Sequence, residues 1–530
     1  MQNLDFNRVE SMLSALDMMI IALYAVFLFG VAQWVSRETK GSVRSARDYF
    51  LADKALPWWA IGASLIAANI SAEQIIGMSG SGYAIGLAIA SYEWMAALTL
   101  LIVGKYLLPI FLETGIYTMP QFLERRYDAR VKTVMALFWL GVYTFVNLTS
   151  VLWLGALAMT TVASLDQTVA LMLLGGFALA YSLYGGLKAV ALTDLIQVVL
   201  LMLGGLLIAW ILLDRVGQGA GPWQGFQALM SGAPDKFHMI LAPNHPHYMS
   251  LPGWSVLIGG MWVMNLSYWG FNQYIIQRAL AAKSLREAQK GMAFAAFLKL
   301  LMPVIVVLPG IAMFVLNDQL ASPDQAYPSA MLLLPSGIKG LVIAALLAAI
   351  VSSLASMCNS ISTIFTLDVA PLFGLKPEQD QKVVTLGRQV ALIAMVIAMV
   401  SAKPLLGNFD QAFQYIQEFT GFFTPGIVAI FLLGLFWRQT TGTAALIAAV
   451  ASALLSVVFK MGLPELPFMD RVGAVFILCL LIGVIGSKIW PNHQPGFVDA
   501  ASVNFATDKA FNLSAIVVTL ILVFFYSVWW

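Results

Sequence analysis

The chain has 530 residues, of which 60% are hydrophobic and only 11% are charged, and its mean hydropathy is +0.83. Soluble globular domains do not have this composition, so we expect an integral membrane protein. The net charge of +2 gives no sign of nucleic-acid binding, because no basic patch stands apart from the predicted membrane loops.

A helix that crosses a bilayer needs ~20 mostly apolar residues. Fourteen segments meet this requirement, in order 14–35, 57–83, 87–111, 131–160, 167–185, 188–213, 253–277, 291–316, 336–367, 383–402, 409–436, 442–461, 467–488 and 510–529. The first segment is already of full span length and no small-residue cleavage site follows it, so a signal peptide is not predicted. We expect an all-α membrane protein with about 14 transmembrane helices.

The distribution of Lys and Arg predicts the orientation of these helices. The loop 36–56 carries five basic residues, and the loops on its side of the membrane together hold 20, against seven on the other side. Basic residues are enriched in cytoplasmic loops. We therefore place both termini on the outer side of the membrane.

Two apolar segments contain a similar polar interruption. Asn69-Ile70-Ser71 lies in the second span and Asn265-Leu266-Ser267 in the seventh, and each of these spans opens a block of five. Because five is odd, the second block must be inverted relative to the first, which is typical of transporters with a broken first helix in each repeat. We predict one transporter domain, 1–530. It would consist of an extra N-terminal helix (14–35), two inverted repeats (57–213 and 253–436) and three extra C-terminal helices (442–529).

Two opposite charges, Glu93 and Lys299, lie inside membrane-length apolar segments. Such charges are costly in lipid and usually face a cavity or a substrate path. They can form a structural ion pair, or they can orient a neutral polyol, because each sugar hydroxyl both donates and accepts hydrogen bonds. Gln74, Asn265 and Gln417 can complete a ring of hydrogen bonds around such a solute.

The span 336–367 contains the hydroxyl pair Ser352-Ser353. Serines in membrane helices often bond back to carbonyls of the preceding turn. A hard cation also prefers oxygen ligands, and two hydroxyls together with carbonyls freed by a helix break suit Na⁺. No phosphate loop, HExxH or GxSxG motif is present, so we predict a protein that is not an enzyme, has no cofactor and takes its energy from an ion gradient.

The sequence resembles the sodium:solute symporter family and, within it, the bacterial (Vibrio-type) sodium/galactose (glucose) transporters. YSLYGGLKAV at 181–190 is a general symporter signature, and the string from SAEQIIGMSGSGY to SYEW is more specific to the sugar branch. The remaining matching strings are DYFLADKALPWWAIGASLIAANI, FVNLTSV, TDLIQV, YWGFNQYIIQR, AAFLKL, AAIVSSLASM and QAFQYIQEFTG. The resemblance implies the inverted-repeat fold of amino-acid/sodium symporters.

The resemblance also implies a role for individual residues. The sugar ligands of the family fall on Gln74, Glu93, Asn265, Lys299 and Gln417. Its outer gate falls on Met78, Tyr92 and Phe413, and its inner gate on Tyr268, with Asn69 as hydrogen-bond partner. Its sodium site falls on the carbonyls of Ala67, Ile70 and Ala349 and the hydroxyls of Ser352 and Ser353, with Asp194 on the ion's exit path.

Two positions depart from the close relative that the sequence resembles, which has Ser in place of Ala96 and Tyr in place of Ser267. The expected function is Na⁺-coupled import of a hexose, galactose or glucose, by alternating access. Symport of inositol, sialic acid or an amino acid remains open, as does a non-transporting sugar sensor. The expected partners are sugar, Na⁺ and the lipid bilayer, and the oligomeric state, monomer or weak homodimer, is left open.

Overall fold

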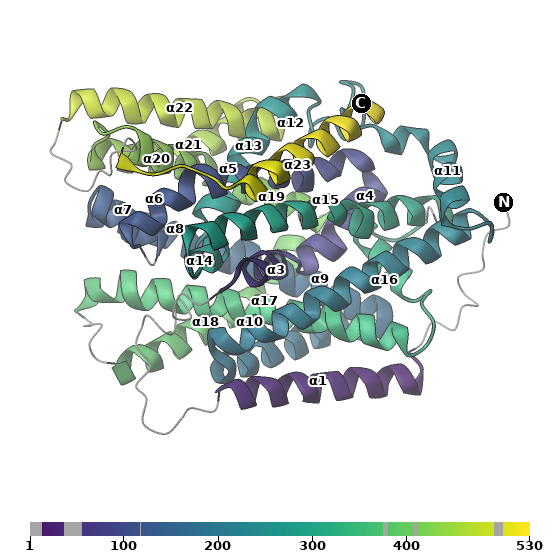
Figure 1. The fold of residues 1–530 in the computed structure, drawn as a ribbon. Coiled ribbons are helices and arrows are strands. Elements are labelled where there is room, and N and C mark those ends of the chain that lie inside the picture. The colour runs from purple at the N-terminus through teal and green to yellow at the C-terminus, as the bar shows by residue number, and fades with distance from the viewer. Residues whose placement is uncertain are drawn as a thin grey trace.

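Long helices lie side by side across most of the computed structural model (Figure 1). It describes residues 13–36, 56–116, 118–317, 319–374, 380–407, 411–491 and 502–530, and within α10 the side chains of 183–194 lie outside this description. The principal helices are α1 (Ala15–Ser36), α5 (Ser91–Ile102), α8 (Ala129–Val142), α9 (Thr149–Ala163), α10 (Gln167–Val216), α15 (Leu285–Leu316), α17 (Ile338–Ile364), α18 (Asp380–Leu406), α20 (Thr424–Phe436), α21 (Gly442–Gly462), α22 (Phe468–Ile489) and α23 (Lys509–Val528).

The described part of the chain contains nine helices that are long and apolar enough to cross a membrane, or eleven if each of two bent pairs is one span. This confirms the predicted multi-pass helical protein, whereas the predicted number of fourteen spans is not established. One difference is α10, which covers both predicted spans 167–185 and 188–213.

The first predicted broken helix is present. The axis bends by 66° between α3 (Trp58–Asn69) and the segment Glu73–Ala84. The segment begins with a π-helical turn, η2 (Glu73–Gly77), and continues as α4 (Met78–Ala84). At the break, Ile70 has extended backbone angles and Ser71 follows outside the helix.

The second broken helix differs from the prediction in position. Asn265 lies inside α13 (Gly260–Leu266), and the chain continues through the π-helical turn η7 (Ser267–Phe271). After Asn265 the helical path is interrupted at Asn272, before α14 (Gln273–Leu280). The side chain of Asn272 accepts a hydrogen bond of 2.7 Å from the Tyr143 hydroxyl, a tertiary contact that the local sequence does not reveal.

Close helix packing around the first break depends on glycine. A Cβ on Gly310 of α15 would lie 2.1 Å from the carbonyl oxygen of Ser79 on α4. A Cβ on Gly82 of α4 would lie 2.7 Å from the carbonyl oxygen of Val307. Only glycine permits this approach, and small residues are typical of such membrane interfaces.

Segments predicted on one side of the membrane contact one another. Asp17 of α1 accepts hydrogen bonds from the backbone at the start of α17, and Met239 donates one to Trp529 near the C-terminus. On the opposite side, Lys290 pairs with Asp508. In Figure 1 the end of α23 and α11 (Pro222–Gly232) lie toward the same end of the molecule. These contacts therefore agree with the predicted alternation of the loops between the two sides of the membrane.

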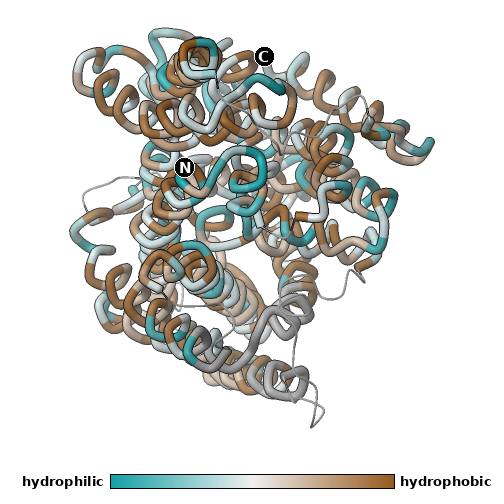
Figure 2. The backbone as a smooth tube through the Cα atoms, turned by 90° about the vertical axis from the view of Figure 1, so that its left-hand side faces the viewer, coloured by the Kyte–Doolittle hydropathy of each residue, from teal (hydrophilic) through white to brown (hydrophobic). Residues whose placement is uncertain are grey.

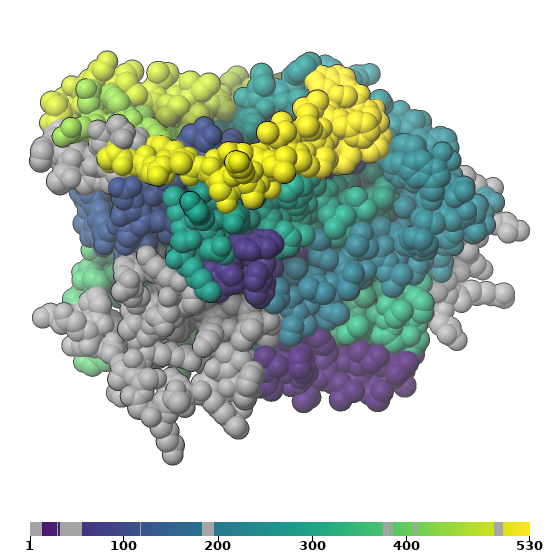
Figure 3. All heavy atoms as spheres, in the orientation of Figure 1, coloured from purple at the N-terminus to yellow at the C-terminus, as the bar shows by residue number. Residues whose placement is uncertain are grey.

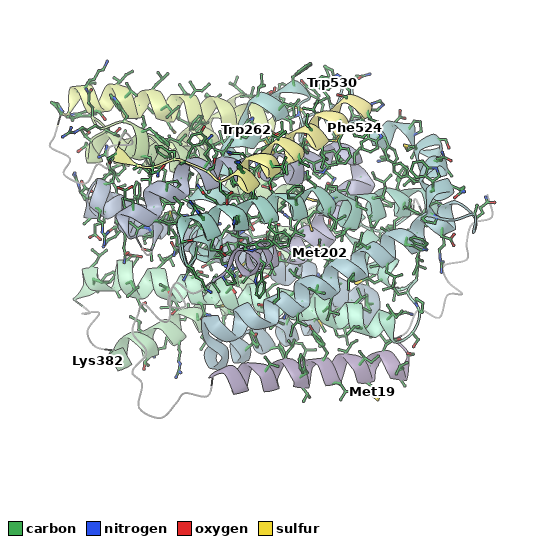
Figure 4. The ribbon with its side chains drawn as sticks, in the orientation of Figure 1. Met19, Met202, Trp262, Lys382, Phe524 and Trp530 are labelled. Carbon is green, nitrogen blue, oxygen red and sulfur yellow. The ribbon has the colours of Figure 1, made fainter. Side chains whose placement is uncertain are left out.

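The outer helices present apolar side chains at the surface. Figure 2 shows hydrophobic stretches along these helices, and α1 and α23 cover opposite edges of the face in Figure 3. Met19 and Phe524 project from these two helices and are 52% and 60% exposed, whereas Met202 lies within the bundle (Figure 4). Exposed apolar residues in this pattern are typical of a lipid-facing surface.

Candidate functional site

A polar cavity lies between the first broken helix and helices of the second half of the chain. It has about 960 Å³ of space not filled by protein atoms, which includes space open to the solvent. Its lining includes residues of three π-helical turns, η2, η5 (Tyr143–Leu148) and η7. Such turns widen a helix locally and are frequent at functional sites. Here they turn polar side chains from three separate helices toward one space.

Glu93 and Lys299 face each other in this cavity. The ammonium Nζ of Lys299 lies 2.5 Å from Oε2 of Glu93. Both side chains are almost completely buried, and Lys299 also donates a hydrogen bond to Asn69. The ring of Trp269 lies under the ammonium, with its centroid 4.9 Å from Nζ. The two intramembrane charges therefore form an ion pair and line the cavity as well.

Gln74 connects the ion pair to the first broken helix. Its amide donates hydrogen bonds to Oε1 of Glu93 at 2.8 Å and to Asn69 at 3.4 Å. Among the described residues, its buried Oε1 has no hydrogen-bond partner. A buried acceptor of this kind is costly unless a ligand or water satisfies it. This oxygen is therefore a suitable acceptor for a solute hydroxyl.

The other two predicted sugar ligands also line the cavity. Asn265 is held in place by a hydrogen bond of 3.2 Å from its amide to the carbonyl of Met261. Gln417 belongs to α19 (Ala412–Thr420), which is bent by 45° relative to α20. All five predicted sugar ligands thus lie around one space.

Aromatic rings close one side of the cavity. Tyr92 and Phe413 pack edge to face with ring centroids 5.1 Å apart. Both line the cavity, whereas Met78, the first residue of α4, is completely buried and is not among the lining residues. The predicted outer-gate residues Tyr92 and Phe413 therefore touch each other, in an arrangement that restricts passage.

A chain of hydrogen bonds connects Asn69, Tyr268 and Tyr274. Asn69 donates a hydrogen bond of 3.0 Å to the hydroxyl of Tyr268, which in turn lies 2.9 Å from the hydroxyl of Tyr274. This places the predicted inner-gate residue between the breaks of the two repeats. Its ring can serve as a platform, and its polar tip has the partner that a buried tyrosine needs.

The predicted sodium ligands are only partly brought together. Ala67, Ser352 and Ser353 line one small pocket between α3, α14 and α17, to which α14 contributes Tyr274 and Arg278. Ile70 and Ala349 are not among the residues that line it. The predicted exit residue, Asp194, lies outside the described side chains. In the described residues no cluster of three His, Cys, Asp or Glu side chains is placed to hold a metal ion.

Glu73 and Asn147 are among the polar residues of the cavity that the sequence-based prediction missed. Glu73 directly precedes the predicted ligand Gln74, but a helical periodicity would point adjacent residues in different directions. The π-helical turn changes this geometry. Asn147 belongs to the FVNLTSV string, which matches the family, but the resemblance assigned no role to this residue. The two departures from the close relative, Ala96 and Ser267, also line the cavity.

Comparisons with known proteins agree with this architecture. The chain is 50% identical to the sodium/glucose cotransporter of Vibrio parahaemolyticus over 543 aligned positions, covering 99% of this chain and 100% of that protein. It is 32% identical to the mouse sodium/myo-inositol cotransporter 2, covering 83% and 69% of the two chains.

Two solved structures show the same fold. A Na⁺-coupled sialic acid symporter in a substrate-bound outward-open state has a TM-score of 0.77 at 22% identity, covering 91% of this chain and 99% of that one. A nucleobase-cation-symport-1 family transporter in a closed conformation has a TM-score of 0.53 at 14% identity, with coverage of 90% and 100%. The model of the sodium:solute symporter family matches residues 49–451. The chain belongs to the sodium:solute symporter family and is a sodium-coupled membrane transporter, not an enzyme.

Proposed function

We propose that the protein imports a hexose, galactose or glucose, together with Na⁺ by alternating access. The observation that carries this proposal is the buried pair of Glu93 and Lys299 beside the unsatisfied Oε1 of Gln74. An anionic acceptor, a cationic donor and a neutral amide within one cavity match the alternating donors and acceptors of a sugar. The high identity to a sodium/glucose cotransporter supports the same substrate class.

Sodium would act at the pocket of Ala67, Ser352 and Ser353. A cation there would hold α3 against α17 and stabilise the position of the break that carries Asn69 and Gln74. Because coupling between two ligands is reciprocal, release of Na⁺ toward the cytoplasm would weaken sugar binding. The carbonyls of Ile70 and Ala349 would join the ion's ligands after a small local movement, and Asp194 would lie on its exit path.

Tyr92 and Phe413, with Met78 behind them, would form the outer gate, and Tyr268 with Asn69 the inner gate. In this proposal 57–213 and 253–436 are the two repeats that move relative to each other. The protein would lie in a bacterial inner membrane with both termini outside. The predominance of basic residues in the loops assigned to the cytoplasm supports this orientation.

Uptake into proteoliposomes tests the proposed function. Purified protein would be reconstituted and offered labelled galactose or glucose with an inward Na⁺ gradient, with equal Na⁺ on both sides, or with K⁺ in place of Na⁺. Accumulation only under the Na⁺ gradient is expected. Uptake without dependence on Na⁺ would contradict symport, and absence of uptake of either sugar would contradict the hexose assignment.

A further inference from the structure

Three charged side chains line the central cavity: Glu73, Glu93 and Lys299. Glu93 and Lys299 form the ion pair at 2.5 Å, so their charges largely cancel. Among the ion pairs within the described residues, none includes Glu73. The cavity therefore contains two carboxyl groups and one ammonium group, and within the described residues Glu73 is the carboxyl group that no basic side chain neutralises.

A neutral group holds the Glu73 carboxylate in place. The hydroxyl of Ser150 on α9 lies 3.0 Å from its Oε1, in a position to donate, and Asn147 lines the same cavity. A neutral donor fixes the direction of a carboxylate without cancelling its charge. An ionised carboxylate has about four acceptor sites, so this contact leaves acceptor capacity toward the cavity.

Glu73 is also close to the predicted ligands. It precedes Gln74 in the same π-helical turn, and both residues line the cavity with Tyr268. A solute held by Gln74 and Glu93 would therefore lie near a second carboxylate. For a sugar, this carboxylate is an additional acceptor for a hydroxyl group. For a solute with its own carboxylate, it is a like charge in a site with little water to screen it.

We propose that Glu73 is a specificity-determining residue that restricts transport to uncharged polyols and excludes solutes bearing a carboxylate. The inference rests on the proposed sugar-binding role of this cavity and narrows its substrate class. At an effective dielectric constant of about 20, two like charges ~6 Å apart change affinity by on the order of a hundredfold. Hexoses and inositol satisfy this rule, whereas sialic acid and amino acids do not.

The first experiment needs no variant. Labelled galactose uptake into proteoliposomes is measured against three competitors: unlabelled galactose, galacturonate and the methyl ester of galacturonate. We expect galacturonate to compete at least about tenfold more weakly than galactose, and the uncharged ester to compete clearly better than the acid. Equal competition by acid and ester would overturn the proposal, because charge would then not decide acceptance.

Variants then assign the effect to Glu73. Glu73→Gln should reduce the discrimination against galacturonate by about tenfold or more, whereas Glu73→Asp, which keeps the charge, should retain most of it. Glu113→Gln on α6 (Leu108–Thr114) is the matched control, since Glu113 is exposed and does not line the cavity. Unchanged discrimination in Glu73→Gln would overturn the assignment. If that variant does not insert, the acid–ester comparison on the unaltered protein decides.

Failure of the hexose proposal is a separate result. If neither galactose nor glucose is taken up with Na⁺, the proposed exclusion of carboxylate-bearing solutes is tested with labelled myo-inositol, sialic acid and an amino acid. Each is offered under the same Na⁺ gradient. Uptake of myo-inositol alone would support the rule. Uptake of sialic acid or of the amino acid would overturn it.

Discussion

Nζ of Lys299 lies 2.5 Å from Oε2 of Glu93, and both groups are buried in a chain in which only 11% of residues are charged. Lys299 lies on α15 and Glu93 on α5, and the two residues are 206 positions apart in the sequence. A buried ion pair is weak evidence for stability, because desolvation offsets much of its attraction. Its position in the cavity, beside an unsatisfied acceptor on Gln74, favours a role in binding.

Neutralising either charge should therefore impair sugar binding. Glu93→Gln and Lys299→Ala each remove a charge-assisted hydrogen bond, which is worth roughly 1.5–3 kcal/mol, or about ten- to hundredfold in affinity. We expect little effect on the half-saturating Na⁺ concentration. Equilibrium binding of labelled galactose measures both variants. Recovery of transport in the double neutral variant would show that the two charges serve only each other.

Ser353→Ala should abolish Na⁺-dependent uptake in protein that is still folded and inserted. The variant removes one hydroxyl from the small pocket between α3 and α17, and a weakly bound ion cannot easily replace an oxygen ligand. Initial uptake rates across a series of Na⁺ concentrations test this. Na⁺ stimulation with an unchanged half-saturating concentration would place the ion site elsewhere.

The hydroxyl of Tyr268 should matter for transport more than for binding. Tyr268→Phe keeps the ring and loses the contacts with Asn69 and Tyr274, so this variant should bind sugar but transport it poorly or leak. Tyr268→Ala should lose the platform and coupled accumulation. Initial uptake and steady-state accumulation, corrected for inserted protein, measure both. If Tyr268→Phe transports normally and Tyr268→Ala is only less stable, Tyr268 contributes to packing and is not a gate.

Arg126 should contribute to stability without affecting the site. Its buried guanidinium donates hydrogen bonds to the carbonyls of Gly434 at 2.7 Å and Trp437 at 3.0 Å, and to two further carbonyls near the end of α20. Arg126→Ala removes these hydrogen bonds. The carbonyl of Trp437 still accepts from Thr440, so we expect a total loss of roughly 1–3 kcal/mol, mainly from the buried carbonyl of Gly434. The thermal unfolding temperature in detergent should fall clearly, with sugar affinity in the remaining folded protein unchanged.

The matched control is Arg125→Ala, because Arg125 is exposed and donates to the single carbonyl of Thr114. Its unfolding temperature should stay close to that of the unaltered protein. Equal shifts for the two variants would mean that the carbonyl contacts of Arg126 do not set the stability of this end of the bundle.

The sequence by itself determined the membrane class, the helical fold and the family. Apolar runs of span length require helices in lipid, because every backbone group must be bonded within its own segment. The rarity of intramembrane charge singled out Glu93 and Lys299, and the polar run after Asn69 marked the first break. These signals are local, so a linear pattern contains them.

Only the tertiary structure decided how these residues meet. The interruption of the second repeat lies at Asn272, where a hydrogen bond from Tyr143 on another helix stabilises the extended backbone. The π-helical turn at Glu73 brings a second carboxylate into the cavity beside Gln74, which a regular helical periodicity does not predict. The ion pair of Glu93 and Lys299, left open by the sequence, depends on the packing of α5 against α15. Contacts between distant segments set these features, and a single sequence does not encode them in any local pattern.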